Sequence, residues 1–327
     1  MLYSKIIGLG SYYPSQIVNN STLSQIVDTN DEWITTRTGI KQRRISSGEN
    51  TSQMALIAAK KAIHDAAITK EEIDMVILST ITPDFFTPST ASLIQAELGL
   101  IDTPSFDISA GCTGFIYCVQ IADQFIKSGQ CKTILVIGAE VLSKVTNWSD
   151  RNTCVLFGDG AGAAILKGDE KEGIISTYTG SQGDLQGHLT LPAVPVCNPF
   201  LKYQENNRHQ SHIYMNGKEI FKFATRIMIK SINRVLEQSD YSIDDIDYII
   251  PHQANIRIID YVSQKLKVDK ERFIVNLDQF GNTSAASVPL AMDEAYRNQR
   301  FCKGDKIIMV AFGGGLTWGA VLVNWII

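Results

Sequence analysis

Short apolar runs alternate with longer amphipathic stretches along the chain. Apolar runs of strand length, bounded by polar residues, are typical of strands that are buried on both faces. Four of them predict buried strands at residues 75–78, 133–137, 248–250 and 307–310. Because helical stretches lie between the runs, the order favours an α/β protein with mostly parallel sheets.

Two of the intervening stretches repeat apolar residues every three or four positions, as one face of a helix does. In the first, Phe115, Val119, Ala122 and Ile126 follow this spacing. It predicts a helix over 115–126. The same pattern predicts a second helix over 217–238, with the apolar residues Phe221, Ala224, Met228, Ile232 and Val235.

The chain also contains an internal repeat. Residues 72–77 resemble residues 245–250, and residues 133–136 resemble residues 306–309. Both matches have the same offset along the chain, so chance similarity between short apolar strands is the weaker explanation. We therefore predict a duplicated chain.

The predicted halves are residues 1–172 and 173–327, and the shared offset aligns His252 with Ser79. Each of these residues closely follows a predicted strand. Ligands of open α/β sheets bind beyond the carboxyl ends of the strands. Two pseudo-symmetric halves would bring those ends together, so loops from both halves would face one cleft.

Composition narrows the class of protein. The 327 residues are 44% apolar and 20% charged, which is ordinary for a globular protein with a large core. The net charge of −4 and the pI of about 5.8 argue against nucleic acid as a partner. No apolar run reaches the roughly 18–20 residues of a membrane helix, and the start lacks a secretory signal. We expect a cytoplasmic protein that does not enter the membrane.

The sequence contains no strong motif for a metal site, a disulfide framework or a redox cofactor. The six cysteines form no Cys-x-x-Cys pair, so we expect reduced thiols rather than disulfides. Only His209 and His212 lie close together in the sequence, within one polar loop, and we expect no metal site. The glycines at 160–162 and 313–315 match neither a phosphate-binding loop nor a dinucleotide fingerprint, which argues against a nucleotide redox cofactor.

Cys112 lies in a small-residue segment, 107–115, between a predicted strand and a predicted helix. A thiol at such a turn points toward a helix N-terminus, whose partial charge favours thiolate. Thiolates attack thioesters and leave them readily, so this position suits an acyl carrier. The alternative is a buried cysteine that packs as a small hydrophobe. We assign that role to Cys118 and Cys154.

Two further segments each place a hydrogen-bond donor at an element boundary. His252 follows a buried strand in residues 251–255, and Asn282 precedes a helical stretch in residues 281–287. Taken singly, a histidine here is more often a core residue and an asparagine more often a helix cap.

Together with two glycine-rich segments, these motifs occur in a recognisable order. The chain resembles the β-ketoacyl-acyl-carrier-protein synthase III family of thiolase-fold enzymes, with matching elements from Trp33 to Trp318. The resemblance implies a thiolase-like fold whose two pseudo-duplicated halves form a layered α-β-α-β-α core, and a homodimer. The motifs that carry it are residues 107–115, 157–162, 251–255, 281–287 and 311–319.

The resemblance implies an acyltransferase that initiates type II fatty acid synthesis. Cys112 would take an acyl group from acyl-CoA, and His252 and Asn282 would bind the thioester carbonyl of malonyl-acyl carrier protein. Loss of CO₂ would generate the carbanion that attacks the acyl-cysteine. Two neutral donors stabilise the developing oxyanion best where water is excluded, so His252 must be uncharged. This chemistry requires no metal or redox cofactor.

Further roles follow from the same resemblance. Backbone N–H groups of Cys112 and Gly314 would form an oxyanion hole. Phe312 matches an aromatic gate between the cysteine and the donor pair, although plain core packing explains a Phe equally well.

Two surface regions are implied as binding sites. Trp33 and Arg151 would sandwich the adenine of CoA while Arg37 holds the nucleotide, an arrangement favoured by cation–π attraction. Because acyl carrier protein is acidic, its docking site should be basic. The matching residues are Lys222 and Arg257, with Lys265 nearby on the same helical stretch, although a solvated helix face has the same pattern.

Two positions depart from the family. Thr87 replaces a bulky aromatic at the end of the acyl channel, and this predicts room for longer or branched primers unless Phe85 or Phe86 fills the space. Residues 194–212 form a longer and more polar segment than in common relatives. Sequence alone does not explain its purpose.

Three other functions remain open. An ester-forming acyltransferase or a condensing enzyme of secondary metabolism would use the same acyl-cysteine, although such enzymes often alter the His252 or Asn282 position. A non-catalytic acyl-CoA-binding protein would form no covalent adduct.

Overall fold

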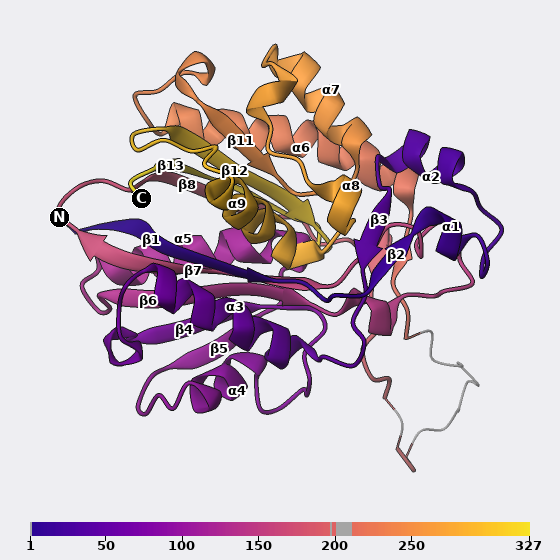
Figure 1. The fold of residues 1–327 in the computed structure, drawn as a ribbon, viewed down its shortest axis with the longest axis horizontal. Helices are drawn as coiled ribbons and strands as arrows, with labels where there is room; N and C mark the ends of the chain where they lie inside the picture. The colour runs from indigo at the N-terminus through magenta and orange to yellow at the C-terminus, as the bar shows by residue number, and fades with distance from the viewer. Residues whose placement is uncertain (1, 197, 201–210) are drawn as a thin grey trace.

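Two β-sheets, one from each half of the chain, form the frame of the protein. The computed structural model describes residues 2–196, 198–200 and 211–327. The sheets lie above one another with helices between them and on both outer faces (Figure 1). This arrangement is the α-β-α-β-α core that the family resemblance implies.

The N-terminal sheet has the strand order β1-β7-β6-β4-β5, and β4 runs parallel to both β5 and β6. Strand β7 runs antiparallel to both β1 and β6. The strands are β1 (Tyr3–Tyr12), β4 (Met75–Ser79), β5 (Ser105–Ile108), β6 (Thr133–Glu140) and β7 (Gly160–Asp169).

The C-terminal sheet has the order β11-β12-β13-β8, in which only β11 and β12 are parallel among its described strands. The prediction of mostly parallel sheets is therefore wrong. Strand β13 returns directly from β12 through a short glycine-containing turn, and such short connections join antiparallel neighbours. The strands are β8 (Ile174–Ser181), β11 (Tyr248–Pro251), β12 (Lys306–Gly313) and β13 (Thr317–Asn324).

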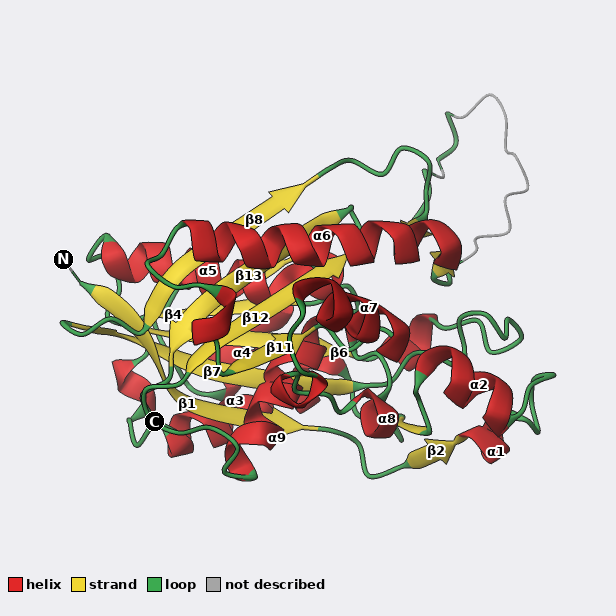
Figure 2. Ribbon diagram, turned by 90° about the horizontal axis from the view of Figure 1, so that it is seen from above, coloured by secondary structure: helices red, strands yellow, loops and turns green. Residues whose placement is uncertain are grey.

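Helices α5 (Gly114–Lys127) and α9 (Ser287–Arg297) fill the layer between the sheets. The four apolar residues that predict the first helix are all buried on α5. Helices α3 (Thr51–Asp65) and α4 (Thr90–Glu97) cover the outer face of the N-terminal sheet. Helices α6 (Gly217–Glu237) and α7 (Ile256–Leu266) cover the C-terminal sheet and lie side by side (Figure 2). The four predicted strands and two predicted helices are thus confirmed.

The smaller elements connect the larger ones, and several lie together at one end of the sheets. The short strands and helices are β2 (Ile17–Asn19), β3 (Gln42–Arg44), α1 (Asn20–Leu23), α2 (Asp31–Thr38), α8 (Leu277–Phe280), β9 (Leu189–Thr190) and β10 (Tyr214–Met215). The 3₁₀ turns are η1 (Lys70–Glu72), η2 (Gly111–Thr113), η3 (Leu142–Val145), η4 (Ile243–Asp245), η5 (Lys270–Arg272) and η6 (Ser284–Ala286).

The offset of the sequence repeat recurs throughout the frame. Five pairs of elements start at positions related by this same offset: η1 and η4, β4 and β11, η2 and η6, α5 and α9, and β6 and β12. The order β1-β7-β6-β4 of one sheet also corresponds to β8-β13-β12-β11 of the other. The predicted boundary, after position 172, lies in the short turn between β7 and β8.

The halves meet where the two equivalent turns η2 and η6 face each other. A Cβ atom added to Gly138, on β6, would lie 2.3 Å from the carbonyl oxygen of Ala285. Backbone hydrogen bonds reinforce this junction: Asn282 N donates to Leu156 O (2.8 Å) and Gly158 N to Asn282 O (3.0 Å). Close backbone contact therefore fixes the two halves against each other.

Among the described residues, no helix is long and apolar enough to cross a membrane. His212 is exposed, whereas Cys197 and His209 lie outside the described residues. Part of segment 194–212 is likewise not described. No three His, Cys, Asp or Glu side chains of the described ranges could together hold a metal ion.

Substitution Gly138→Ala should destabilise the protein by about 1–3 kcal/mol or more, because the new methyl group would overlap the Ala285 carbonyl oxygen. Chemical denaturation monitored by circular dichroism would measure the loss. Gly183→Ala is the matched control, since an added Cβ there meets no atom within 4 Å. Equal stability of the two variants would contradict the close junction.

Candidate active site

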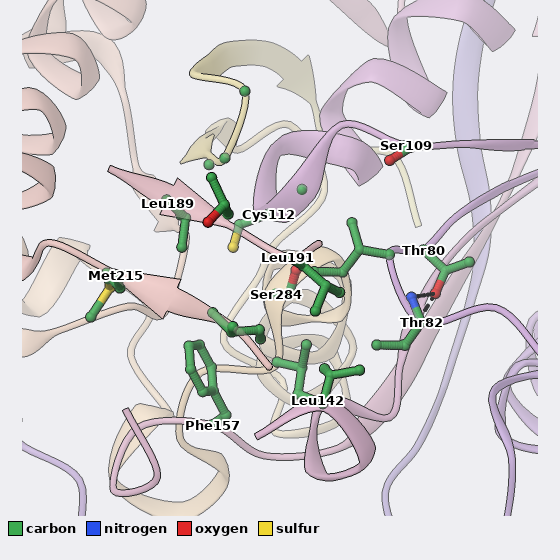
Figure 3. Close-up of a pocket in the computed structure, with 18 of the residues that line it drawn as sticks. Thr80, Thr82, Ser109, Cys112, Leu142, Phe157, Leu189, Leu191, Met215 and Ser284 are labelled. Carbon is green, nitrogen blue, oxygen red and sulfur yellow. Dashed lines mark hydrogen bonds between the residues drawn. The ribbon is translucent and has the colours of Figure 1, made fainter. Parts of the chain in front are cut away.

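One cavity of about 1230 Å³ lies at the junction of the halves. It is lined by Cys112 from the N-terminal half and by His252 and Asn282 from the C-terminal half. The sequence-predicted catalytic residues therefore face one space. Figure 3 shows the Cys112 sulfur and the Ser284 hydroxyl directed into this cavity, with Thr80 and Thr82 nearby.

Glycines allow the backbone around Cys112 to pack against the 313–315 turn. Gly111 has a φ of +53°, and a Cβ there would lie 3.0 Å from the amide nitrogen of Gly314. A Cβ on Gly313 would lie 2.5 Å from the amide nitrogen of Cys112. The Thr317 hydroxyl also donates to the Ala110 carbonyl (3.0 Å). The structure thus places Gly314 beside the cysteine, where the family resemblance puts the oxyanion hole.

The Cys112 thiol is neutral at rest. Burial raises its pKa to about 12, and the charge of Glu140 raises it further, against the lowering effect of a hydrogen bond with Ser284. Desolvation therefore acts against the predicted effect of the helix start on the thiolate. Helix α5 begins at Gly114, two residues after Cys112.

His252 follows directly on β11 and is 2% exposed. Its Nδ1 lies 2.7 Å from the Ser287 hydroxyl, which also accepts from the backbone N–H of Gln253. The Ser287 hydroxyl can donate its proton to Nδ1, and in that arrangement the ring N–H lies on Nε2. Burial lowers the pKa of His252 to about 3, so the imidazole is an uncharged donor, as the proposed chemistry requires.

Asn282 is oriented by its own backbone neighbourhood. Its side-chain Oδ1 accepts a hydrogen bond from the Ser284 N–H (2.8 Å). The carboxamide oxygen is therefore occupied, and the Nδ2 amino group is the part that can serve the cavity as a donor. Asn282 is not a helix cap here, because it precedes the η6 turn rather than the helix.

Phe312 lines the cavity and is also packed in the core. Its ring lies 5.3 Å from the His252 ring and 6.4 Å from that of Phe223, edge to face in both cases. Core packing of Phe312 is therefore confirmed, and its role as a gate stays a prediction.

The proposed CoA-binding residues gather outside this cavity. The guanidinium groups of Arg37 and Arg151 lie 4.6 Å and 4.7 Å from the centre of the Trp33 ring. Arg151 also donates to the Asp28 carbonyl (3.0 Å). The structure brings the three residues together, but Arg151 stacks on Trp33 itself, so an adenine between them would have to separate the pair.

The proposed docking residues are exposed on α6 and α7. Lys222 pairs with Glu219 at 2.8 Å. Arg257 lies over the ring of Phe221 at 5.9 Å, which places it next to the Lys222 region of α6. Lys265 lies two turns beyond Arg257 on α7, about 12 Å along the helix axis.

Thr87 does not have the predicted position. It is exposed and does not line the cavity, whereas Phe85, Phe86 and Ser89 from the same segment do. The argument that a small residue widens the acyl channel therefore does not apply to Thr87. The bulky neighbours that could fill that space are at the cavity mouth instead.

Sequence reasoning missed Glu140, Ser284 and Ser287. The two serines lie in the 281–287 motif but carry no signal of their own among so many small residues. Glu140 could have been found, because it is a carboxylate at the end of an otherwise apolar buried strand. Its carboxylate lies behind the cavity, where it accepts hydrogen bonds from Thr80, Thr82 and Ser284, which do line it. A buried acid beside a cavity is a recognised indicator of function.

Two family models match the chain. The model described as 3-oxoacyl-[acyl-carrier-protein (ACP)] synthase III matches residues 106–183, and its C-terminal counterpart matches residues 236–325. Together they contain Cys112, His252 and Asn282.

Proteins and structures that are similar over nearly the whole chain include ones named for the same family. The chain is 54% identical to the beta-ketoacyl-[acyl-carrier-protein] synthase III of Clostridium novyi, with 98% of each chain covered. It matches the 3-oxoacyl-[acyl-carrier-protein] synthase III structure from Aquifex aeolicus at 47% identity and a TM-score of 0.92, covering 98% of this chain and 100% of that one. It also matches the priming β-ketosynthase of the R1128 polyketide pathway at 34% identity and a TM-score of 0.91, covering 99% and 96%.

The buried neutral imidazole predicts a pH-dependent contribution to stability. The unfolded state takes up a proton near pH 6.5, whereas burial lowers the pKa of His252 to about 3 in the folded state. The contribution of His252 to the free energy of unfolding is therefore fully present above pH 6.5. It is lost as the pH falls toward 3, by up to about 1.4 kcal/mol per pH unit.

Glu140 changes the free energy of unfolding in the opposite direction as the pH falls, because burial raises its pKa to about 7. The contribution of His252 is isolated by comparing the wild type with His252→Asn. The difference between their free energies of unfolding should shrink as the pH is lowered from 7 to 5. A constant difference over this range would contradict a buried neutral imidazole.

Proposed function

Since this chain belongs to the 3-oxoacyl-[acyl-carrier-protein] synthase III family, we propose that it condenses an acyl-CoA primer with malonyl-acyl carrier protein. The product is a 3-oxoacyl-acyl carrier protein, and the reaction initiates type II fatty acid synthesis. The observation that carries the proposal is the convergence of Cys112, His252 and Asn282 on one cavity.

In the first half-reaction, the Cys112 sulfur attacks the thioester carbonyl of the primer and expels CoA. The backbone N–H groups of Cys112 and Gly314 stabilise the tetrahedral oxyanion. Support comes from the close packing of the two turns, which fixes these amides without reorganisation during the reaction.

In the second half-reaction, Nε2–H of His252 and Nδ2–H of Asn282 bind the thioester oxygen of the malonyl group. Negative charge develops on that oxygen as CO₂ leaves, and two uncharged donors in a dry site stabilise it strongly. The resulting carbanion attacks the acyl-cysteine, and the Cys112 thiolate leaves. Neither half-reaction calls for a metal or redox cofactor.

The partners form part of the proposal. Trp33, Arg37 and Arg151 hold the CoA nucleotide, and Lys222, Arg257 and Lys265 receive the acidic carrier protein. A homodimer is supported by the exposed aromatic rings of Phe85 and Phe86, which are 57% and 81% exposed in the single chain. We place the protein in the cytoplasm.

A related condensing role in secondary metabolism is the second candidate, favoured by the similarity to a priming ketosynthase of a polyketide pathway. Both candidates, and an ester-forming acyltransferase, would acylate Cys112. A panel of acyl-CoA primers and carrier proteins distinguishes them by the product formed.

Intact-mass measurement tests the nucleophile and the donors. Incubation with acyl-CoA should add one acyl group to the wild type and none to Cys112→Ala. Asn282→Ala should still be acylated, while its condensation rate with malonyl-acyl carrier protein falls about 10²–10³-fold. An adduct that persists in Cys112→Ala would show that another residue is the nucleophile, and a wild type without adduct would favour a binding protein.

Charge reversal tests the docking site. Arg257→Glu should raise the KM for malonyl-acyl carrier protein about tenfold at low salt, with a smaller effect at high salt, because the carrier is acidic. Lys60→Glu is the matched control, since Lys60 is exposed on α3 at the opposite face. Equal KM values for the two variants would place the docking site elsewhere.

A further inference from the structure

A buried carboxylate joins the two halves behind the active-site cavity. Glu140 ends strand β6 and is fully buried. Within its own half, its Oε2 accepts from the hydroxyls of Thr82 (2.6 Å) and Thr80 (3.1 Å), and from the Ile81 N–H (3.1 Å). Across the junction, its Oε1 accepts from the Ser284 hydroxyl (3.1 Å). None of the ion pairs among the described residues includes Glu140, and the proposed reaction leaves this acid without a role.

Further hydrogen bonds fix the carboxylate on its N-terminal side. The Thr82 hydroxyl accepts from the Val141 N–H (2.9 Å), and the Thr80 hydroxyl accepts from the Thr82 N–H (3.0 Å). Each hydroxyl therefore has a backbone donor in addition to the bond that it donates to Glu140. An ionised carboxylate has about four acceptor sites, and its four donors fill them. Glu140 thus has a fixed position from which it holds Ser284.

Ser284 in turn holds the side chain of Asn282. The Ser284 N–H donates to Asn282 Oδ1 (2.8 Å), which leaves the Nδ2 amino group for the cavity that Asn282 lines. The direction of that N–H depends on the Ser284 backbone, which has a φ of +49°. Residues other than glycine disfavour this left-handed conformation, so it needs support from its surroundings. The hydrogen bond from the Ser284 hydroxyl to Glu140 provides such support.

The internal repeat contains an equivalent contact on the other side of the junction. The shared offset aligns Ser284 with Gly111, which has a φ of +53°, and aligns Glu140 with Gly313. Gly313 packs against the nucleophile turn, because a Cβ there would lie 2.5 Å from the amide nitrogen of Cys112. The ends of the equivalent strands β6 and β12 therefore each hold a turn of the opposite half. One does so through a missing side chain and the other through a carboxylate.

We propose that Glu140 is a positioning residue for the condensation step, and that it holds Asn282 in its donor orientation by anchoring Ser284 across the junction. The inference rests on the proposed role of Asn282 in binding the malonyl thioester. In this role no covalent bond to Glu140 forms or breaks, and its carboxylate does not touch the substrate. The anchor serves the second half-reaction, because acylation of Cys112 uses the backbone amides of Cys112 and Gly314 instead.

Separate measurement of the two half-reactions tests the proposal. Quenched intact mass follows acylation by acetyl-CoA or butyryl-CoA, and then the loss of the adduct when the acylated enzyme meets malonyl-acyl carrier protein. Glu140→Met replaces the carboxylate by an apolar side chain of similar length. Its condensation rate should fall about 10–100-fold, because misplacing a catalytic group by about 1 Å can cost about 10²-fold in rate. Its acylation rate should be no lower than that of the wild type, since the charge of Glu140 raises the pKa of the Cys112 thiol and the variant lacks that charge.

Double substitutions show whether the effect of Glu140 passes through Ser284 and Asn282. In the Asn282→Ala background, Glu140→Met should cause no further loss of condensation, because the group that it positions is already absent. Ser284→Ala should reproduce the loss, and adding Glu140→Met to it should change nothing further, because both substitutions break the same hydrogen bond. Losses that multiply in either pair would overturn the proposal.

Other roles of Glu140 give other results in the single variant Glu140→Met. A base in the acylation step would lower the acylation rate, a purely electrostatic effect on the thiol would leave condensation unchanged, and a folding defect would lower both rates equally. Each of these outcomes overturns the proposal.

Asp123→Asn is the matched control. Asp123 is a fully buried carboxylate of the same half, is bonded to Ser4 and Lys127, and does not line the cavity. The control should leave the ratio of the two rates unchanged, and a shift equal to that of Glu140→Met would overturn the proposal. A wild type that forms no acyl adduct would instead reject the proposed function.

Discussion

Burial at the junction between the halves governs the charge states of Cys112, Glu140 and His252. Burial raises the pKa values of Cys112 and Glu140 and lowers that of His252, so each group is driven toward its neutral form. For His252 this is what an oxyanion donor requires. For Cys112 it creates a difficulty, because the reactive species is the anion. Acylation of Cys112 therefore requires that the thiol lose its proton.

The dry junction depends on backbone contacts that side chains could not make. Gly138 brings β6 against the η6 turn, and Gly111 and Gly313 bring the nucleophile turn against the glycine turn of the other half. These contacts fix backbone amides beside the sulfur, where an oxyanion needs donors that do not have to reorganise. The glycines thus support the proposed catalysis because their missing side chains allow the backbones to approach closely.

Most of the frame could be predicted from sequence because it rests on apolar burial. The runs at β4, β6, β11 and β12 are buried strands, and the helical spacing of α5 is its buried face. Strand direction could not be predicted this way, because a fully buried strand has the same apolar pattern in either orientation. The charge state of Cys112 was not predictable either, since desolvation depends on packing from both halves. Thr87 is a similar case: a family position fixes the segment but not the direction of each side chain.

Duplication explains how one molecule provides two kinds of chemistry on similar scaffolds. The repeat relates Ser79 and Gly114 in the N-terminal half to His252 and Ser287 in the C-terminal half. A Cβ on Gly114 would overlap the Ser79 hydroxyl oxygen at 1.6 Å, and the corresponding pair His252 and Ser287 forms a hydrogen bond of 2.7 Å.

Equivalent positions therefore make a tight packing contact in the N-terminal half. In the C-terminal half they orient His252, a proposed catalytic donor. In the facing turns, Cys112 corresponds to Ala285, so the nucleophile occurs only once. Ser284, the residue next to Ala285 in the facing turn, donates a hydrogen bond to Glu140 of the N-terminal half (3.1 Å). Because the duplicated turns meet at the junction, each half completes the site of the other, and neither half contains all of the proposed catalytic residues.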